Sequence, residues 1–159
     1  MSATLLMEIL EKLDKLHSSL YEIAVKKTEI IKNGDIESLN GIMKEEHVHV
    51  QAITKLEEAR QAAAKRICPD LDNVTVSDCL NQVHGSEREG LLDAADKLAE
   101  KVAQLREQNH VNQQMLHNSL QFVHFSLNLL RPQPAAINYA PPTKKTQNNP
   151  TPGMFNSKA

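Results

Sequence analysis

Residues 86–130 read SEREGLLDAADKLAEKVAQLREQNHVNQQMLHNSLQFVHFSLNLL, and this stretch largely determines the expected fold. Its small, apolar and amide residues recur every three or four positions, as on one face of an α-helix. They are Leu91, Ala95, Leu98, Val102, Leu105, Asn109, Asn112, Leu116 and Ser119. Ser86 and Glu89 have the spacing of a capping box, and no glycine or proline lies between Leu91 and Pro132. We therefore expect one helix over about 87–130, roughly 66 Å long.

The end of this helix, residues 116–130, is apolar on every side. At roughly 100° per residue, the apolar side chains surround the helix axis: Leu120, Phe122, Val123, Phe125, Leu127, Leu129 and Leu130. A helix that is apolar all round has to be buried all round. The rest of the chain is too small to surround it, so the segment predicts a surface for a partner.

Two further long helices precede it. The first, over about 4–32, has apolar residues at helical spacing: Leu5, Ile9, Leu13, Leu16, Leu20, Ile23 and Ile30. Gly34 suits the left-handed end of a helix, and Asp35 suits the cap of the next. The second, over about 35–67, is stopped by Pro69 and carries Leu39, Ile42, Met43, Val50, Ile53, Leu56, Ala59 and Ala63. The Thr75–Asp78 spacing predicts a short capped helix over 75–82.

Together these segments predict an all-α fold, an elongated antiparallel bundle or coiled coil of three long helices with a short connecting helix. If the helices run up, down and up, the third outruns its neighbours by roughly ten residues. The overhang falls at about 120–130, within the segment that is apolar all round. Residues 1–131 form the helical domain. Six of the seven prolines lie in 132–159, a composition that predicts a disordered, flexible tail.

Composition excludes several classes of protein. Residues 1–131 hold all 20 acidic residues and 15 of the 18 Lys and Arg residues, a net charge of −5. An acidic body argues against nucleic-acid binding, and the short apolar runs argue against membrane insertion. Cys68 and Cys79 lack metal-ligand spacing and are expected to be reduced thiols in a cytoplasmic protein. The start of the chain lacks a secretory signal.

Catalytic and metal sites are not expected. No phosphate-binding glycine loop or nucleophile motif is present. His110, His117 and His124 are each separated by two turns, roughly 10.5 Å, too far for one metal ion. Glu46–His49 and Glu107–His110 match the Glu-x-x-His pairs of di-iron bundles, but such sites also need a fourth helix. We expect no cofactor, no metal and no enzymatic activity, with the di-metal bundle as the least favoured alternative.

Amide side chains on or beside the stripe of the third helix have two interpretations. Asn109, Asn112, Gln113 and Gln114 would cost stability in a core unless they are paired. They either form a polar layer that fixes the register of a bundle, or mark where the stripe leaves the core and meets a partner.

Three patterns carry a resemblance to a known family. The first is Asn109-x-x-Asn112-x-x-Met115-Leu116-x-x-Ser119-Leu120-x-Phe122, ending in Leu127-x-Leu129-Leu130. The second is the break at Ile30–Leu39, and the third comprises Glu45-Glu46 and Leu56-Glu57-x-x-Arg60. In their order and spacing they resemble the FlgN family of flagellar export chaperones, over most of residues 5–130.

The resemblance implies a cytoplasmic chaperone that binds hook-associated (hook–filament junction) proteins and hands them to the flagellar type III export apparatus. The C-terminal part of such a chaperone embraces a terminal amphipathic helix of the client, a helix-in-groove mode. The residues expected to bind the client are Leu116, Leu120, Phe122, Val123, Phe125, Leu127, Leu129 and Leu130, with Asn109 and Asn112 as orienting hydrogen-bonders. The alternative is a structural or oligomeric coiled-coil adaptor, in which 116–130 pairs with a second copy as a homodimer or folds back on its own body.

Overall fold

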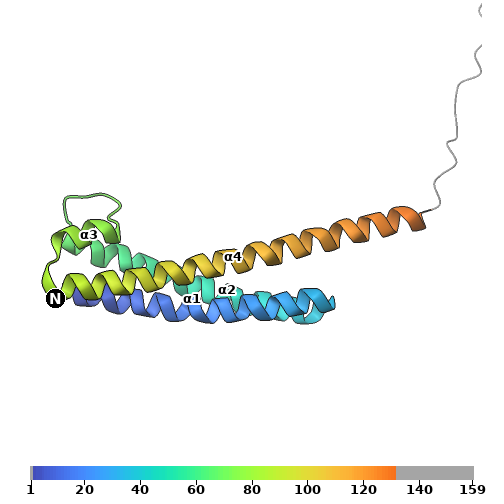
Figure 1. Cartoon of the computed structure of the whole chain (residues 1–159), viewed down its shortest axis with the longest axis horizontal. Helices are drawn as coiled ribbons and strands as arrows, with labels where there is room; N and C mark the ends of the chain where they lie inside the picture. Colours follow the sequence, from blue (N-terminus) through green and yellow to red (C-terminus); the bar gives the residue numbers. More distant parts are fainter. Residues whose placement is uncertain (1, 132–159) are drawn as a thin grey trace, which may run out of the picture.

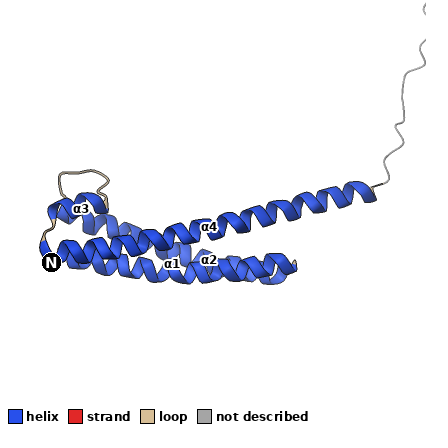
Figure 2. Cartoon of the chain, in the orientation of Figure 1, coloured by secondary structure: helices blue, strands red, loops and turns tan. Residues whose placement is uncertain are grey.

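The computed structural model describes residues 2–131, and the described chain is helical apart from its short connections (Figure 2). The helices are α1 (Ser2–Asn33), α2 (Ile36–Ile67), α3 (Val76–Gln82) and α4 (Gly85–Leu130). The prediction of an all-α fold with three long helices and a short connecting one is confirmed. The expected tail, 132–159, lies outside the described residues.

The helix ends follow from local chemistry. Gly34 has φ +67°, the left-handed conformation that ends α1. Asp35 then caps α2 by accepting a hydrogen bond from the Ser38 backbone N–H at 3.0 Å. Hydrogen bonds from the Ser38 hydroxyl and backbone also hold the pKa of Asp35 below its usual value. Thr75 and Asp78 form the expected capping box at the start of α3.

α1 is the central helix of the molecule. It packs along α2 and along α4, whereas within residues 2–131 the backbones of α2 and α4 stay farther from each other than from α1. Figure 1 shows α1 and α4 running in one direction and α2 in the other, the up-down-up course expected from the short turn at Gly34. α3 bridges the end of α2 and the beginning of α4.

The main core lies at the end of the molecule where α3 is found. Leu6, Leu10, Leu13 and Leu91 are completely or almost completely buried there, together with Val74 and Cys79. A smaller cluster, formed by Leu20, Ala24 and Leu105, lies farther along α1 and α4. The buried core of the bundle is therefore largest at the α3 end and becomes smaller toward the α1–α2 turn.

Several sequence expectations were wrong in detail. Leu5, expected on the stripe of α1, is exposed. Met43 and Val50 are half exposed, because α2 packs mainly against α1 and only a narrow stripe of it is covered. Leu6 and Leu10 are buried although the expected stripe of α1 omitted them, because α1 has neighbours on two faces. Ser86 does not cap α4. The helix begins earlier, at Gly85, whose φ of +63° turns the chain after His84.

α4 is much longer than its neighbours. It has 46 residues against 32 in α1 and in α2, or about 69 Å against about 48 Å. Figure 1 shows its final third, drawn in orange, extending past the turn that joins α1 to α2. The predicted overhang is therefore present.

Candidate functional site

The overhang can be located from one contact between α1 and α4. Thr28 of α1 contacts Asn112 of α4, with 2.6 Å between Thr28 Oγ1 and Asn112 Oδ1. α1 continues for five residues beyond Thr28 and ends at Asn33, and the same number of residues on α4 leads to His117. From there to Leu130, no other helix of residues 2–131 runs beside α4 (Figure 1). We call residues 117–130 the distal segment.

The apolar residues expected to bind a client lie mostly on this segment and are exposed. Leu120, Phe122, Val123, Phe125, Leu127, Leu129 and Leu130 have exposed fractions from 49% at Val123 to 78% at Leu130. Leu116, just before the segment, is half buried. Contiguous apolar surface of this kind marks an interaction site. The exposed Ile36, Met43 and Val50 of α2 are more widely spaced, since they lie seven residues apart.

The exposed residues form two stripes. Leu116, Leu120, Val123, Leu127 and Leu130 follow one another at alternating spacings of four and three, and we call them the inner stripe. Phe122, Phe125 and Leu129 form the outer stripe, roughly 150° away around the helix axis at about 100° per residue. Polar residues separate the stripes: Ser119 and Ser126 on one edge, and His117, Gln121, His124 and Asn128 on the other.

The same end of α4 carries no formally charged side chain. Between Glu107 and Arg131 there is no Asp, Glu, Lys or Arg. Elsewhere the long helices are densely charged, with ion pairs such as Lys27–Glu46 at 2.8 Å and Lys97–Asp93 at 2.7 Å. Burial of the distal segment by a partner would therefore desolvate no Asp, Glu, Lys or Arg side chain of α4, which removes the largest cost of burying a helix.

Asn112 lies inside the bundle, with an exposed fraction of only 2%. Its Nδ2 donates to the Ala24 carbonyl at 2.8 Å, and its Oδ1 accepts from the Thr28 hydroxyl at 2.6 Å. Gln108 Nε2 donates to the same hydroxyl oxygen at 2.6 Å. These contacts correspond to the polar layer that the sequence left open as one interpretation. Thr28 and Gln108 were missed, because nothing in a sequence shows which residue of α1 faces Asn112.

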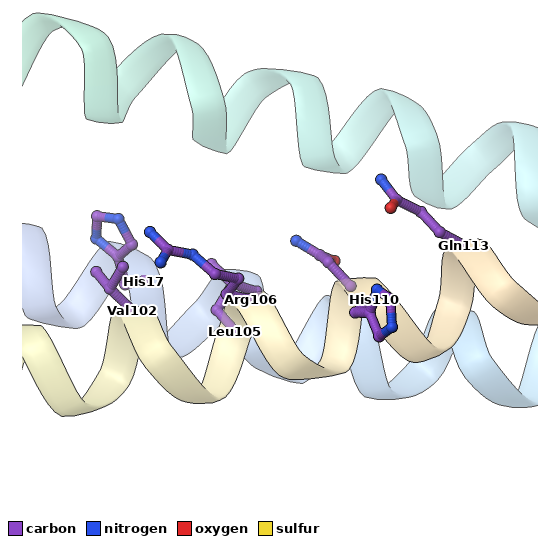
Figure 3. A pocket seen from close by; sticks show the side chains of 7 residues that line it. His17, Val102, Leu105, Arg106, His110 and Gln113 are labelled. Atoms are coloured by element: carbon purple, nitrogen blue, oxygen red, sulfur yellow. The ribbon is translucent and has the colours of Figure 1, made fainter.

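Asn109 has a different environment. It is half exposed and lines an open pocket of 370 Å³ between α1 and α4. The pocket is also lined by His17, Val102, Leu105, Arg106, His110 and Gln113. Figure 3 shows Arg106 and Gln113 reaching from α4 toward the side on which α2 lies. This pocket is open and has both polar and apolar lining residues, and it lies before the point where α4 leaves the bundle.

The residues considered for metal binding have other surroundings. Glu46 forms its ion pair with Lys27, and His49 Nδ1 lies 2.9 Å from the Glu45 carbonyl. Within residues 2–131 no group of three or more His, Cys, Asp or Glu side chains is arranged to hold a metal ion. Cys68 and Cys79 are buried free thiols. Burial raises the pKa of the Cys79 thiol to about 11, and the neighbouring Cys68 thiol adds to this.

No helix in the described part of the chain has the length and hydropathy needed to cross a membrane.

Comparisons with known proteins agree with the architecture. The sequence model of the family described as FlgN protein matches residues 1–147. The chain is also 32% identical over 140 residues to YvyG, an uncharacterized protein of Bacillus subtilis (strain 168), and the match covers 88% of each chain. No solved structure matches the chain.

Proposed function

The chain belongs to the FlgN family of flagellar export chaperones, and from this we propose that it binds terminal amphipathic helices of hook-associated (hook–filament junction) proteins. In this proposal it acts in the cytoplasm, prevents premature assembly of the junction proteins and delivers them to the flagellar type III export apparatus. The family is one of chaperones and not of enzymes, and the protein's work is accordingly binding and release.

The observation that supports this proposal is the distal segment of α4. It presents two exposed apolar stripes on an uncharged helix, and the bundle of α1, α2 and the first part of α4 holds it in place from one end only. A helix of this kind is suited to helix-in-groove recognition, with apolar anchors at i, i+3, i+4 and i+7. The residues proposed to contact the client are Leu116, Leu120, Phe122, Val123, Phe125, Leu127, Leu129 and Leu130.

The two asparagines take different roles in this proposal. Asn109 borders an open pocket, so its amide is accessible and can orient a client. The Asn112 amide is buried and bonded to α1. We therefore assign to it the setting of the register between α1 and α4, which determines how far the distal segment projects.

Binding would protect both partners. A terminal amphipathic helix of a junction protein exposes an apolar face before assembly, and the distal segment exposes one here. Covering one with the other removes both apolar surfaces from water, at roughly 25 cal/mol per Å². It also occupies the client helix until the export apparatus takes the client over.

The proposal is tested by a double variant, Phe122→Asp with Leu127→Asp, which places a charge in each stripe. Co-expressed with the junction proteins of the same organism, the wild type is expected to retain them in a pull-down, and the variant is expected to lose them. Circular dichroism should show unchanged helix content, because neither side chain packs against the bundle. The matched control is Val48→Asp with Leu71→Asp, two exposed apolar residues elsewhere, and it should bind as the wild type does.

A variant that still binds tightly places the client site elsewhere. A wild type that retains no junction protein contradicts the proposed function itself.

The alternating four-and-three spacing of the inner stripe favours one other candidate, a coiled-coil adaptor that pairs with its own copy. Sedimentation velocity distinguishes the coiled-coil adaptor from the export chaperone. A dimer that persists at every concentration and dissociates in the Phe122→Asp, Leu127→Asp variant would support the adaptor.

A further inference from the structure

Beyond Asn33, where α1 ends, no other helix of the described chain covers the inner stripe of α4. We call this open place beside the α1–α2 turn the notch, and it extends the proposed function. We propose that the client helix docks there as an end-to-end continuation of α1, lying on the inner stripe of α4 and abutting Ile36 at the turn. This inference rests on the proposed function and adds to it a position for the client helix and a second contact surface on the chaperone.

The inner stripe continues an interface that already exists in the bundle. Leu105 and Asn112 face α1 and are buried against it. Leu116, Leu120, Val123, Leu127 and Leu130 follow within the same arc of about 80° at about 100° per residue. The face of α4 that packs on α1 therefore continues to the end of the helix, on the same side of the helix axis. A client helix on this face takes the place that a longer α1 would occupy.

The turn leaves that place open. Gly34 ends α1, and Asp35 starts α2 in the opposite direction, so the chain itself does not continue along α4. Ile36, the first residue of α2, has an exposed fraction of 67%. Side chains on a helix lean toward its N-terminus, which for α2 is the turn. Along the axis of α2, the Ile36 side chain therefore leans past the end of α1.

These dimensions specify the client segment. Leu116 to Leu130 spans about 21 Å of helix, enough for about 14 residues of a client helix. Its contact face must be apolar at alternating spacings of three and four, to match the inner stripe. It needs no charge on that face, since α4 has none between Glu107 and Arg131. The outer stripe of Phe122, Phe125 and Leu129 faces away from this helix, so in this arrangement those three side chains contact a different part of the client.

The inference is tested with Ile36→Asp. An acidic residue is favourable in the first turn of a helix, so the variant is expected to fold. Burial of an isoleucine side chain is worth enough to change affinity by about tenfold or more. With a purified junction protein that the wild type retains, we expect the dissociation constant to rise about tenfold or more in this variant. Val48→Asp is the matched control, because Val48 is equally exposed on the same helix, and we expect its affinity to stay unchanged.

A photo-crosslinking residue at position 36 gives a second measurement, which detects the contact directly and does not depend on weakening the binding. It should crosslink to the junction protein, and the same residue at position 48 should not. If Ile36→Asp binds as the wild type does while Leu120→Asp with Leu127→Asp abolishes binding, the client contacts α4 alone and the inference is wrong, although the proposed function stands. Crosslinking at position 36 to a second copy of this chain also overturns it. If the wild type binds no junction protein, both proposals fail.

Discussion

Asn112 and Thr28 determine where α4 leaves the bundle. The buried amide satisfies both its donor and its acceptor on α1, through the Ala24 carbonyl and the Thr28 hydroxyl. Sliding α4 along α1 by one turn would leave these groups buried without partners, at a cost of about 1–3 kcal/mol for each group. An apolar layer would resist such a shift much less, because apolar contacts are not directional. The pair therefore defines the register and, with it, the length of the overhang.

We predict that Thr28→Val lowers the free energy of unfolding by about 1–3 kcal/mol. The substitution keeps the shape of the side chain but removes the hydroxyl to which Asn112 and Gln108 are bonded. Thr28→Ser keeps the hydroxyl and should cost clearly less. Urea unfolding followed by circular dichroism measures the free energy of unfolding of the wild type and of both variants. Equal stability of Thr28→Val and the wild type would show that the polar layer does not hold the register.

At the level of elements, α4 consists of two parts with different support. Up to about Leu116 its residues pack on α1, and the main core and the smaller cluster both include residues of this part. Beyond that point the helix is continuous but rests only on its own backbone hydrogen bonds and on the nucleus supplied by the first part. The distal segment is therefore part of the same helix without being part of the bundle.

We predict that truncation after Ser119 leaves the stability of the bundle unchanged within about 0.5 kcal/mol and abolishes client binding. The removed residues make no contact with α1 or α2 that the bundle needs, but they carry most of both stripes. Truncation after Arg131 is the control, because it retains the whole of α4. Thermal unfolding and the pull-down measure the two effects separately. A large loss of stability in the shorter protein would mean that the distal segment folds back onto the bundle.

At the level of the whole molecule, charge and apolar surface are kept apart. The helical domain has a net charge of −5, but apart from Arg131 its charges lie at or before Glu107, and the proposed binding surface has none. Binding by such a surface is driven by the removal of apolar area from water. Electrostatic steering, which depends on salt, contributes little.

We predict that the affinity for a junction protein changes less than about threefold between about 0.1 M and about 1 M salt, over which the Debye length falls from about 10 Å to about 3 Å. Isothermal titration calorimetry at several temperatures should also show a negative heat-capacity change. A steep loss of affinity with salt would point instead to the charged faces of α1 or α2 as the binding surface.

The sequence by itself determined the helices, their order and the excess length of α4. Helical periodicity, the Gly34–Asp35 break and the Thr75–Asp78 cap are local signals, and each acts within a few residues of where it is read. The exposure of the distal segment was also predictable, since a helix with many apolar residues on opposite faces in a short chain has too few neighbours to cover them, although polar residues separate its two stripes.

Only the tertiary structure decided which face of each helix is covered. Asn109 and Asn112 look alike in the sequence, yet one borders an open pocket and the other is buried against Thr28. Met43 and Val50 look like core residues but are half exposed, because they lie to one side of the face of α2 that packs on α1. Burial depends on which neighbour lies against a face, and that is a property of the packed helices and not of any one of them.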